Sequence, residues 1–151
     1  MPGGRSNQSA SMIELLQGRV EAGQNDASKW LSLFNPEYSR KLGMPVFPGS
    51  LNLRLGRPFD WLAPRYQPHI ITFGQKEYGG ERDILLLPCT LVTCGRRSAF
   101  LWTPIHPTFG VGKADVVEIV ADVKLRDAYQ LTDGSVVEVE LNLALPDAGR
   151  S

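Results

Sequence analysis

The sequence predicts a single, mainly β domain folded as a barrel or a sandwich, and three observations point to it. The chain has 151 residues, which suits one domain and is too short for two complete ones. Apolar and polar side chains alternate over six or seven short segments, and this is the period of half-buried strands. Few helical stretches separate these segments, which disfavours a doubly wound α/β sheet.

The strands are placed by alternating apolar side chains between turn residues. After Pro48 and Gly49, for example, three leucines alternate with Asn52 and Arg54, which indicates a strand with its polar side chains on one face. The predicted strands are residues 13–21, 51–55, 69–73, 84–93, 98–103, 116–121 and 135–141. The fourth and fifth of these form a predicted hairpin.

Helical signals are short and few. Asp26 or Ser28 can cap a short helix, continuous or broken, in which Pro36 opens a second turn that ends near Gly43. A second short helix is predicted at residues 123–129. Proline and glycine place irregular loops at residues 57–67 and 104–113.

The folded domain is expected to span residues 12–145. Residues 1–11 and 146–151 are small and polar with almost no apolar surface to bury, so both are predicted to be flexible tails. No apolar run approaches the roughly 20 residues that cross a bilayer, and the start lacks the apolar centre of a secretion signal. We therefore expect a cytoplasmic protein with no membrane partner.

The charges are balanced in total but not along the chain. The net charge is zero, yet residues 1–113 hold thirteen basic and eight acidic residues, and residues 114–151 hold three and eight. A protein that holds duplex nucleic acid by neutralising phosphates would have a basic excess and a basic face, so a nucleic-acid partner is disfavoured. A local basic pocket for one small anionic ligand remains compatible with this composition.

The cysteines and histidines do not form a recognisable metal motif. Cys89 and Cys94 lie five residues apart, and adding His69 and His106 gives no zinc-binding spacing. We interpret the two cysteines as reduced, buried thiols. The phosphate loop of Walker type and the Gly-x-Gly-x-x-Gly fingerprint are both missing from the sequence.

One short motif does indicate chemistry. Ser50 and Asn52 stand two residues apart on a predicted strand, so a hydroxyl and an amide oxygen point the same way beside the Pro48-Gly49 turn. Two neutral oxygens suit magnesium that travels with a nucleotide, because the ion keeps several waters and takes its other ligands from phosphates. The alternative interpretation is that both side chains bond to the backbone at the start of the strand.

Three blocks of the sequence, in order and with fitting spacing, resemble the CTP-dependent riboflavin kinases of archaea. They are residues 16–23, residues 41–55 and residues 117–126 together with 131–139. The most specific stretch is Pro48-Gly49-Ser50-Leu51-Asn52. The resemblance covers nearly all of the predicted domain, and it implies a six-stranded cradle-loop β-barrel that transfers a phosphate from CTP to riboflavin, giving FMN, with magnesium.

The resemblance also implies roles for individual residues. Ser50 and Asn52 match the family's magnesium ligands, and Glu118 and Thr103 match residues that contact the flavin, with Thr108 as a second candidate for the threonine. The residues matching the nucleotide-binding segments are Gly23, Gln24, Asn25, Asp26, Ala27, Ser28, Val123, Lys124, Leu125 and Arg126. Lys124 and Arg126 lie around a predicted helix start that Asp122 can cap, so N–H groups and cations can meet an anion there. The alternative is a solvated helix with ordinary surface charges.

Glu118 stands out because it lies inside an apolar strand. An unpaired carboxylate there would be costly, so it needs a partner, and we expect it in the barrel mouth near Arg126. It is the one catalytic candidate that the motifs offer, with His106 as a weaker one that more readily orders its own loop. The alternative for Glu118 is a strand residue that faces water.

The sequence departs from the family in two places. The family's nucleotide loop reads Gly-x-Gly-Glu-Gly, whereas this chain has Gly23-Gln24-Asn25-Asp26-Ala27, so one glycine of three is kept and Ala27 adds a methyl group. About four residues, 108–111, are also inserted before the third block. Two further hypotheses therefore stand beside the kinase: a flavin- or nucleotide-binding barrel without kinase activity, and a barrel that binds DNA or serves in assembly.

Overall fold

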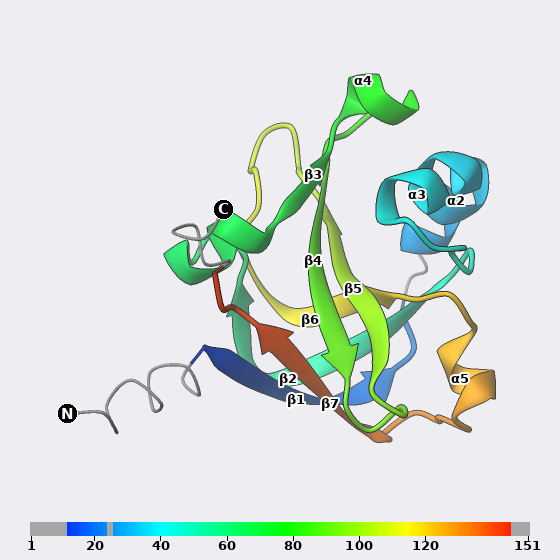
Figure 1. The fold of residues 1–151 in the computed structure, drawn as a ribbon, viewed down its shortest axis with the longest axis vertical. Coiled ribbons are helices and arrows are strands. Elements are labelled where there is room, and N and C mark those ends of the chain that lie inside the picture. The colour runs from blue at the N-terminus through cyan, green and yellow to red at the C-terminus, as the bar shows by residue number, and fades with distance from the viewer. Residues whose placement is uncertain (1–11, 24–25, 146–151) are drawn as a thin grey trace, which may run out of the picture.

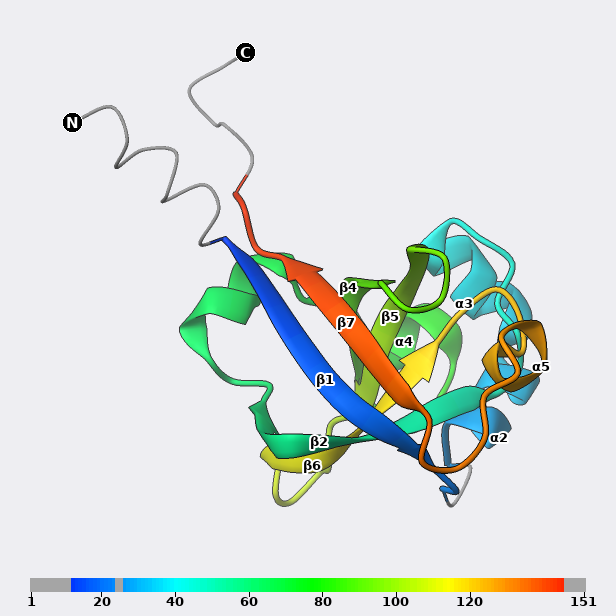
Figure 2. The ribbon, with the colours of Figure 1, turned by 90° about the horizontal axis from the view of Figure 1, so that it is seen from below.

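In the part of the chain that the structure describes, seven antiparallel strands form one sheet that closes on itself. The computed structural model describes residues 12–23 and 26–145. The strand order is β3-β4-β5-β6-β2-β1-β7, and β4 also pairs with β7 (Figures 1 and 2). The closed ring therefore contains six strands, with β3 attached to β4 outside it. The expected six-stranded β-barrel is confirmed.

The elements follow the predicted order. The strands are β1 (Ile13–Glu21), β2 (Ser50–Asp60), β3 (Ile71–Phe73), β4 (Ile84–Leu91), β5 (Arg97–Pro104), β6 (Lys113–Val120) and β7 (Val136–Asn142). The helices are α2 (Asp26–Leu33), α3 (Asn35–Leu42), α4 (Gln75–Tyr78), α5 (Leu125–Ala128) and the 3-10 helix η1 (Pro64–His69). Within the described ranges, none of these helices has the length and apolar character needed to cross a membrane.

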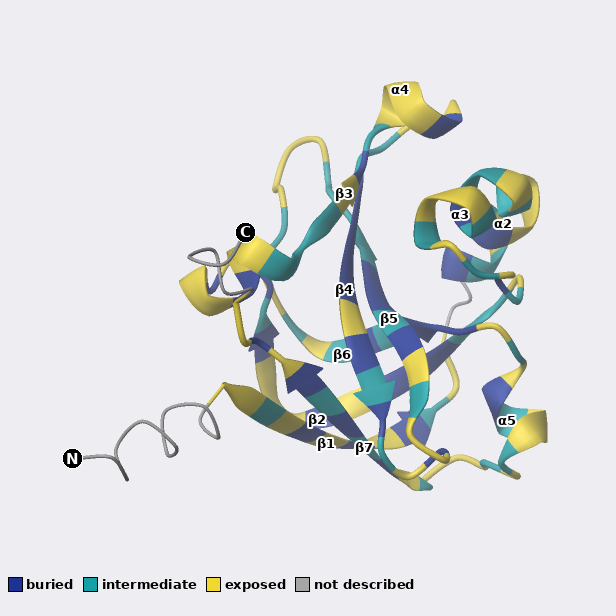
Figure 3. Cartoon of the chain, in the orientation of Figure 1, coloured by how far each residue is buried: buried dark blue, intermediate teal, exposed yellow. Residues whose placement is uncertain are grey.

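Side-chain alternation along the strands separates two apolar clusters. Leu51, Leu53 and Leu55 of β2 point into the barrel, where they belong to the larger cluster together with side chains of the other five barrel strands. The second cluster lies on the outer face of the barrel, beneath α2 and α3 (Figures 1 and 3). Its buried members are Ala27, Leu31, Tyr38, Val46, Phe73, Tyr78, Ile84, Leu86, Trp102 and Val120.

A buried hydrogen bond fixes the two helices on the barrel wall. Trp102 Nε1 of β5 donates to the Tyr38 hydroxyl of α3 over 3.0 Å, and both side chains are almost fully buried. Burial raises the pKa of Tyr38, so its hydroxyl stays protonated. Because α2 precedes α3 directly, this contact also helps to set where α2 begins, next to the start of β2.

The predicted helix between Asp26 and Gly43 is two helices. Pro36 occupies the first turn of α3, where its missing N–H is tolerated, and so it starts a new helix instead of continuing α2. Gly43 ends α3 with a φ of 70°, a left-handed conformation that glycine adopts without strain. The predicted end of the helical stretch near Gly43 is confirmed.

The loop predicted at residues 57–67 is partly wrong. β2 continues to Asp60, and its pairing with β6 passes from Arg54–Val116 to Phe59–Ala114. Four residues of β2 therefore lie opposite one residue of β6, and this bulge lets Pro58 lie in a strand without a ladder hydrogen bond. Two smaller differences are that His69 ends η1 instead of starting β3, and that α4 was not predicted.

Replacing Tyr38 by Phe should lower the free energy of unfolding by about 1–3 kcal/mol, because the buried Trp102 N–H loses its acceptor. Urea denaturation measures this. The matched control is Tyr129→Phe, which removes a partly buried hydroxyl that accepts from Arg97 Nε over 2.7 Å. Water can replace that bond, so the control should cost clearly less. Equal losses in the two variants would contradict the role given to the Tyr38–Trp102 bond.

Candidate functional site

A cavity of about 220 Å³ lies where β2 begins and β6 ends. It joins segments that are far apart in the sequence: the first turn of α2, the Pro48-Gly49 turn, and the connection from β6 to α5. The lining residues are Ser28, Phe47, Pro48, Gly49, Ser50, Leu51, Ile119, Ala121, Val123, Lys124, Leu125 and Arg126. The backbone N–H of Phe47 donates to the carbonyl of Ala121 over 2.9 Å and ties two of these segments together.

Ser50 and Asn52 lie on the same outer face of the barrel, as their spacing predicts. In the ladder between β2 and β6, Ser50 stands opposite Val120 and Asn52 opposite Glu118. The Ser50 hydroxyl donates to Glu118 Oε1 over 2.9 Å. Ser50 lines the cavity, whereas Asn52 and Glu118 are not among its lining residues.

Glu118 also contacts the start of α2. The backbone N–H of Ala27 donates to the same oxygen, Glu118 Oε1, over 3.4 Å. Glu118 does not point into the barrel, and its expected position near Arg126 stays a prediction. Its neighbours in β6 point into the barrel, which directs Glu118 outward, and Arg126 forms an ion pair with Asp133 over 2.7 Å.

The Asn52 side chain occupies space that a side chain at Gly23 would need. Asn52 is the one polar residue in the described parts of the chain that is classed as buried, with 8% exposure. A Cβ atom on Gly23 would lie 1.8 Å from Asn52 Nδ2, far inside any possible contact. Gly23 therefore permits the close approach of the loop backbone to the Asn52 amide. The family resemblance connects Gly23 to the nucleotide, whereas its close approach to Asn52 depends on the fold and has no signal in the sequence.

The donor atoms fit a hard cation. A hydroxyl, an amide and a carboxylate supply oxygen only, which is the ligand type of magnesium. Among the described residues, no group of three or more His, Cys, Asp and Glu side chains could hold a metal. A cation bound by Ser50 and Asn52 would thus have few protein ligands and would depend on water and phosphate oxygens for the rest.

The residues of the predicted nucleotide loop have different environments. Ser28 lines the cavity, whereas Ala27 is fully buried in the cluster beneath the helices. The methyl group that distinguishes Ala27 from glycine therefore packs against the protein and does not line the cavity. Gln24 and Asn25 lie outside the described residues, and Asp26 is the first residue of α2.

The predicted helix of the third block is shorter than expected. α5 begins at Leu125, its N-cap is Lys124, and no side chain caps it. Asp122, the expected cap, forms an ion pair with Arg97 over 2.6 Å. Lys124 has a weak, exposed contact with Asp127 at 3.7 Å, so its ammonium group can turn toward an anion in the cavity at little cost.

The two candidate threonines lie elsewhere. Thr103 is in β5 next to Trp102, the residue that pairs with Glu118, so its side chain points to the opposite face of the sheet. Thr108 lies in the inserted loop, where its N–H and that of Phe109 donate to His106 Nδ1 over 3.1 Å each. His106 thus orders its own loop, in agreement with the weaker role predicted for it.

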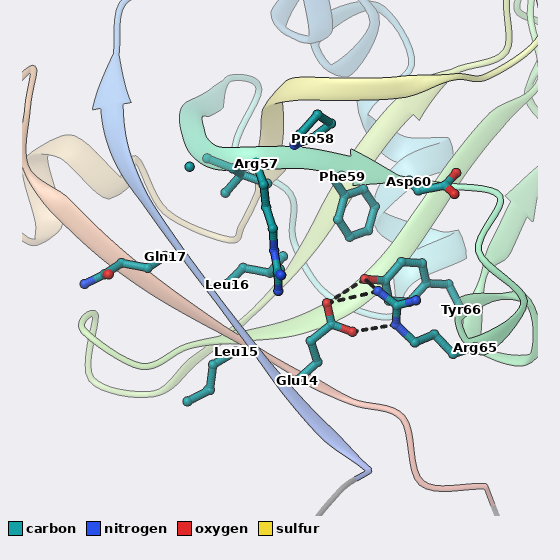
Figure 4. A pocket seen from close by; sticks show the side chains of 12 residues that line it. Glu14, Leu15, Leu16, Gln17, Arg57, Pro58, Phe59, Asp60, Arg65 and Tyr66 are labelled. Carbon is teal, nitrogen blue, oxygen red and sulfur yellow. Dashed lines mark hydrogen bonds and ion pairs between the residues drawn. The ribbon is translucent and has the colours of Figure 1, made fainter.

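A second and larger cavity, of about 340 Å³, lies between the first half of β1 and the second half of β2 (Figure 4). Arg65 and the Tyr66 hydroxyl both donate to the Glu14 carboxylate, over 2.8 and 2.7 Å. Burial raises the pKa of Glu14, but these hydrogen bonds outweigh it and the pKa lies below its ordinary value. Burial raises the pKa of Tyr66 to about 12. The lining contains none of the residues predicted to bind magnesium, nucleotide or flavin.

Comparison with known proteins connects this geometry to a family. The model of the CTP-dependent riboflavin kinase family, described as domain of unknown function DUF120, matches residues 20–141. A riboflavin kinase of Aeropyrum pernix is 33% identical over 130 residues, which are 84% of this chain and 95% of that protein.

Two other relatives are longer. Riboflavin kinases of Pyrobaculum aerophilum and Methanocella arvoryzae are 36% and 32% identical, over 85% and 84% of this chain. The chain spans only 60% and 56% of their lengths. The residues matched by the family model include the whole of the cavity lining, together with Asn52 and Glu118. The chain therefore belongs to the CTP-dependent riboflavin kinase family.

Proposed function

We propose that the protein transfers the terminal phosphate of a nucleoside triphosphate, with CTP preferred, to the 5′-hydroxyl of riboflavin, giving FMN. The observation that carries this proposal is the meeting of the Pro48-Gly49-Ser50 turn, Ser28 and residues 123–126 around one cavity. These are the segments whose sequences match the family's metal and nucleotide motifs. Phosphoryl transfer needs mostly positioning and charge stabilisation, which such a cavity can supply.

In this proposal Ser50 and Asn52 hold magnesium, which when bound would neutralise the phosphate charge. The nucleotide would lie along Gly23, residues 24–28 and residues 123–126. The Lys124 side chain is 54% exposed, and its flexible ammonium group supplies a positive charge for the phosphates. The buried Asn52 amide lies against Gly23, at a position where any Cβ atom would displace it.

The acceptor side is assigned to Glu118 and Thr103. Glu118 accepts a hydrogen bond from Ser50, one of the two proposed metal ligands. That position supports a role in orienting or deprotonating a riboflavin hydroxyl at the cavity. Thr103 points to the face of the sheet opposite to Glu118. In this proposal the two residues therefore contact different sides of the flavin.

A barrel that binds nucleotide or flavin without turnover is the second candidate. The loss of two glycines from the nucleotide loop favours it, because glycine allows the backbone to approach a ligand closely. The burial of Ala27 weakens this argument for one of the two positions. Turnover decides between the two candidates.

Wild-type protein incubated with riboflavin, CTP and magnesium should form FMN, which chromatography separates from riboflavin. The Ser50→Ala/Asn52→Ala variant should lose this activity together with the magnesium-dependent part of CTP binding, with a melting temperature within a few degrees of wild type. Absence of FMN with all four common ribonucleoside triphosphates would reject the kinase and leave the binding module.

Gly23→Ala should weaken magnesium-dependent CTP binding roughly tenfold or more, because the new Cβ displaces the Asn52 amide. Isothermal titration with and without magnesium measures the effect. Gly56→Ala is the matched control, since a Cβ there has no atom within 4 Å. If the two variants bind CTP alike, the Gly23–Asn52 contact does not matter for the site.

Ala27→Gly restores the family's residue but should not tighten CTP binding, because the methyl group is buried away from the cavity. It should instead lower the free energy of unfolding by about 1 kcal/mol, through the lost packing and the greater freedom of glycine. Tighter CTP binding by this variant would show that the methyl group does restrict the ligand.

A further inference from the structure

We propose that Glu118 is a positioning residue for the metal site: it orients the Ser50 hydroxyl and joins it to the first turn of α2. This inference rests on the proposed function. It adds a role for Glu118 in binding magnesium and nucleotide that does not require riboflavin. If it holds, the charge of Glu118 matters for binding of the magnesium–nucleotide pair even when no riboflavin is present.

The first support is that one atom receives two hydrogen bonds from different elements. Glu118 Oε1 accepts from Ser50 Oγ at 2.9 Å and from the Ala27 N–H at 3.4 Å. The carboxylate belongs to β6, the hydroxyl to β2 and the amide to α2. Three segments that border the cavity are therefore held together at this oxygen.

The second support is the direction of the Ser50 proton. A serine hydroxyl has one proton and two acceptor lone pairs, and it rotates freely unless a partner fixes it. Donation to a carboxylate is a charge-assisted bond, and it leaves the lone pairs of Ser50 pointing away from Glu118. A hydroxyl fixed in this way is available as an oxygen ligand, and outer residues of this kind commonly tune the residues that touch a metal.

The third support is the strand register. Glu118 stands directly opposite Asn52 and diagonally to Ser50, so it borders both proposed metal ligands. Its contact with Ala27 lies at the start of α2, and Asn52 in turn lies against Gly23 of the loop that precedes α2. A change at Glu118 should therefore be felt at the metal ligands and at the nucleotide loop together.

The role can be tested by a double-mutant cycle on CTP binding without riboflavin, which excludes any effect through the acceptor. Isothermal titration with and without magnesium would be measured for wild type, Ser50→Ala, Glu118→Gln and the double variant. Glu118→Gln should reduce the magnesium-dependent gain in affinity about tenfold. The double variant should bind no more weakly than Ser50→Ala alone, because Glu118 acts through Ser50.

A matched control is Glu138→Gln on the outer face of β7, also partly buried, which should leave the magnesium-dependent gain unchanged. Glu118→Asp keeps the charge with a shorter reach and should restore part of what Glu118→Gln loses. If Glu118→Gln fails to fold, Glu118→Asp serves as the test variant. It should then lower the magnesium-dependent gain in CTP affinity, and it should cause no further loss when Ser50 is already replaced by Ala.

Two results would overturn the positioning role alone. The first is a magnesium-dependent gain in CTP affinity that Glu118→Gln leaves unchanged. The second is a loss of this gain by Glu118→Gln that is equally large in the wild-type and the Ser50→Ala background. In either case wild-type FMN formation would still support the kinase. A wild-type protein that binds no CTP with magnesium and makes no FMN would overturn the proposed function and this inference together.

Discussion

The alternation of side chains along β2 is the constraint that joins the core of this protein to its site. Leu51 and Leu53 fill the barrel while Ser50 and Asn52 face outward, and both sets come from one four-residue stretch. A slip of one residue would bury the two polar side chains and expose the leucines. The packing of the barrel therefore enforces the register that directs a hydroxyl and an amide toward β6 and α2.

The sequence could predict those parts of the site that depend on local period and turn chemistry. The shared face of Ser50 and Asn52 follows from a two-residue repeat, and the end of α3 at Gly43 follows from a helix-stopping glycine. The direction of Glu118 could not be predicted, because it depends on which strand pairs with β6 and on where α2 packs. The burial of the Ala27 methyl group could not be predicted either, because it depends on how α2 and α3 pack on the barrel.

The kept and the replaced glycines of the family's nucleotide loop lie in different environments in this fold. Gly23, the glycine that is kept, is the one whose Cβ would collide with Asn52. Ala27, a position where glycine is replaced, has its side chain in a packed apolar environment. Loss of glycine is thus tolerated where a methyl group finds core packing, and glycine persists where the backbone must lie against a buried amide.

The bulge in β2 leaves the barrel wall incompletely paired. Along β1, pairing with β7 covers residues 13–19, but pairing with β2 covers only residues 18–21. Within the described residues, the β2-facing edge of residues 13–17 has no strand beside it, and open edges of this kind are where chains join into aggregates. Pro58 cannot donate to such a ladder, and the ion pair of Glu14 with Arg65 places charge at the opening. A residue that cannot donate to a ladder and a charged pair thus lie at this unpaired edge, and both disfavour the addition of a strand from another copy of the chain.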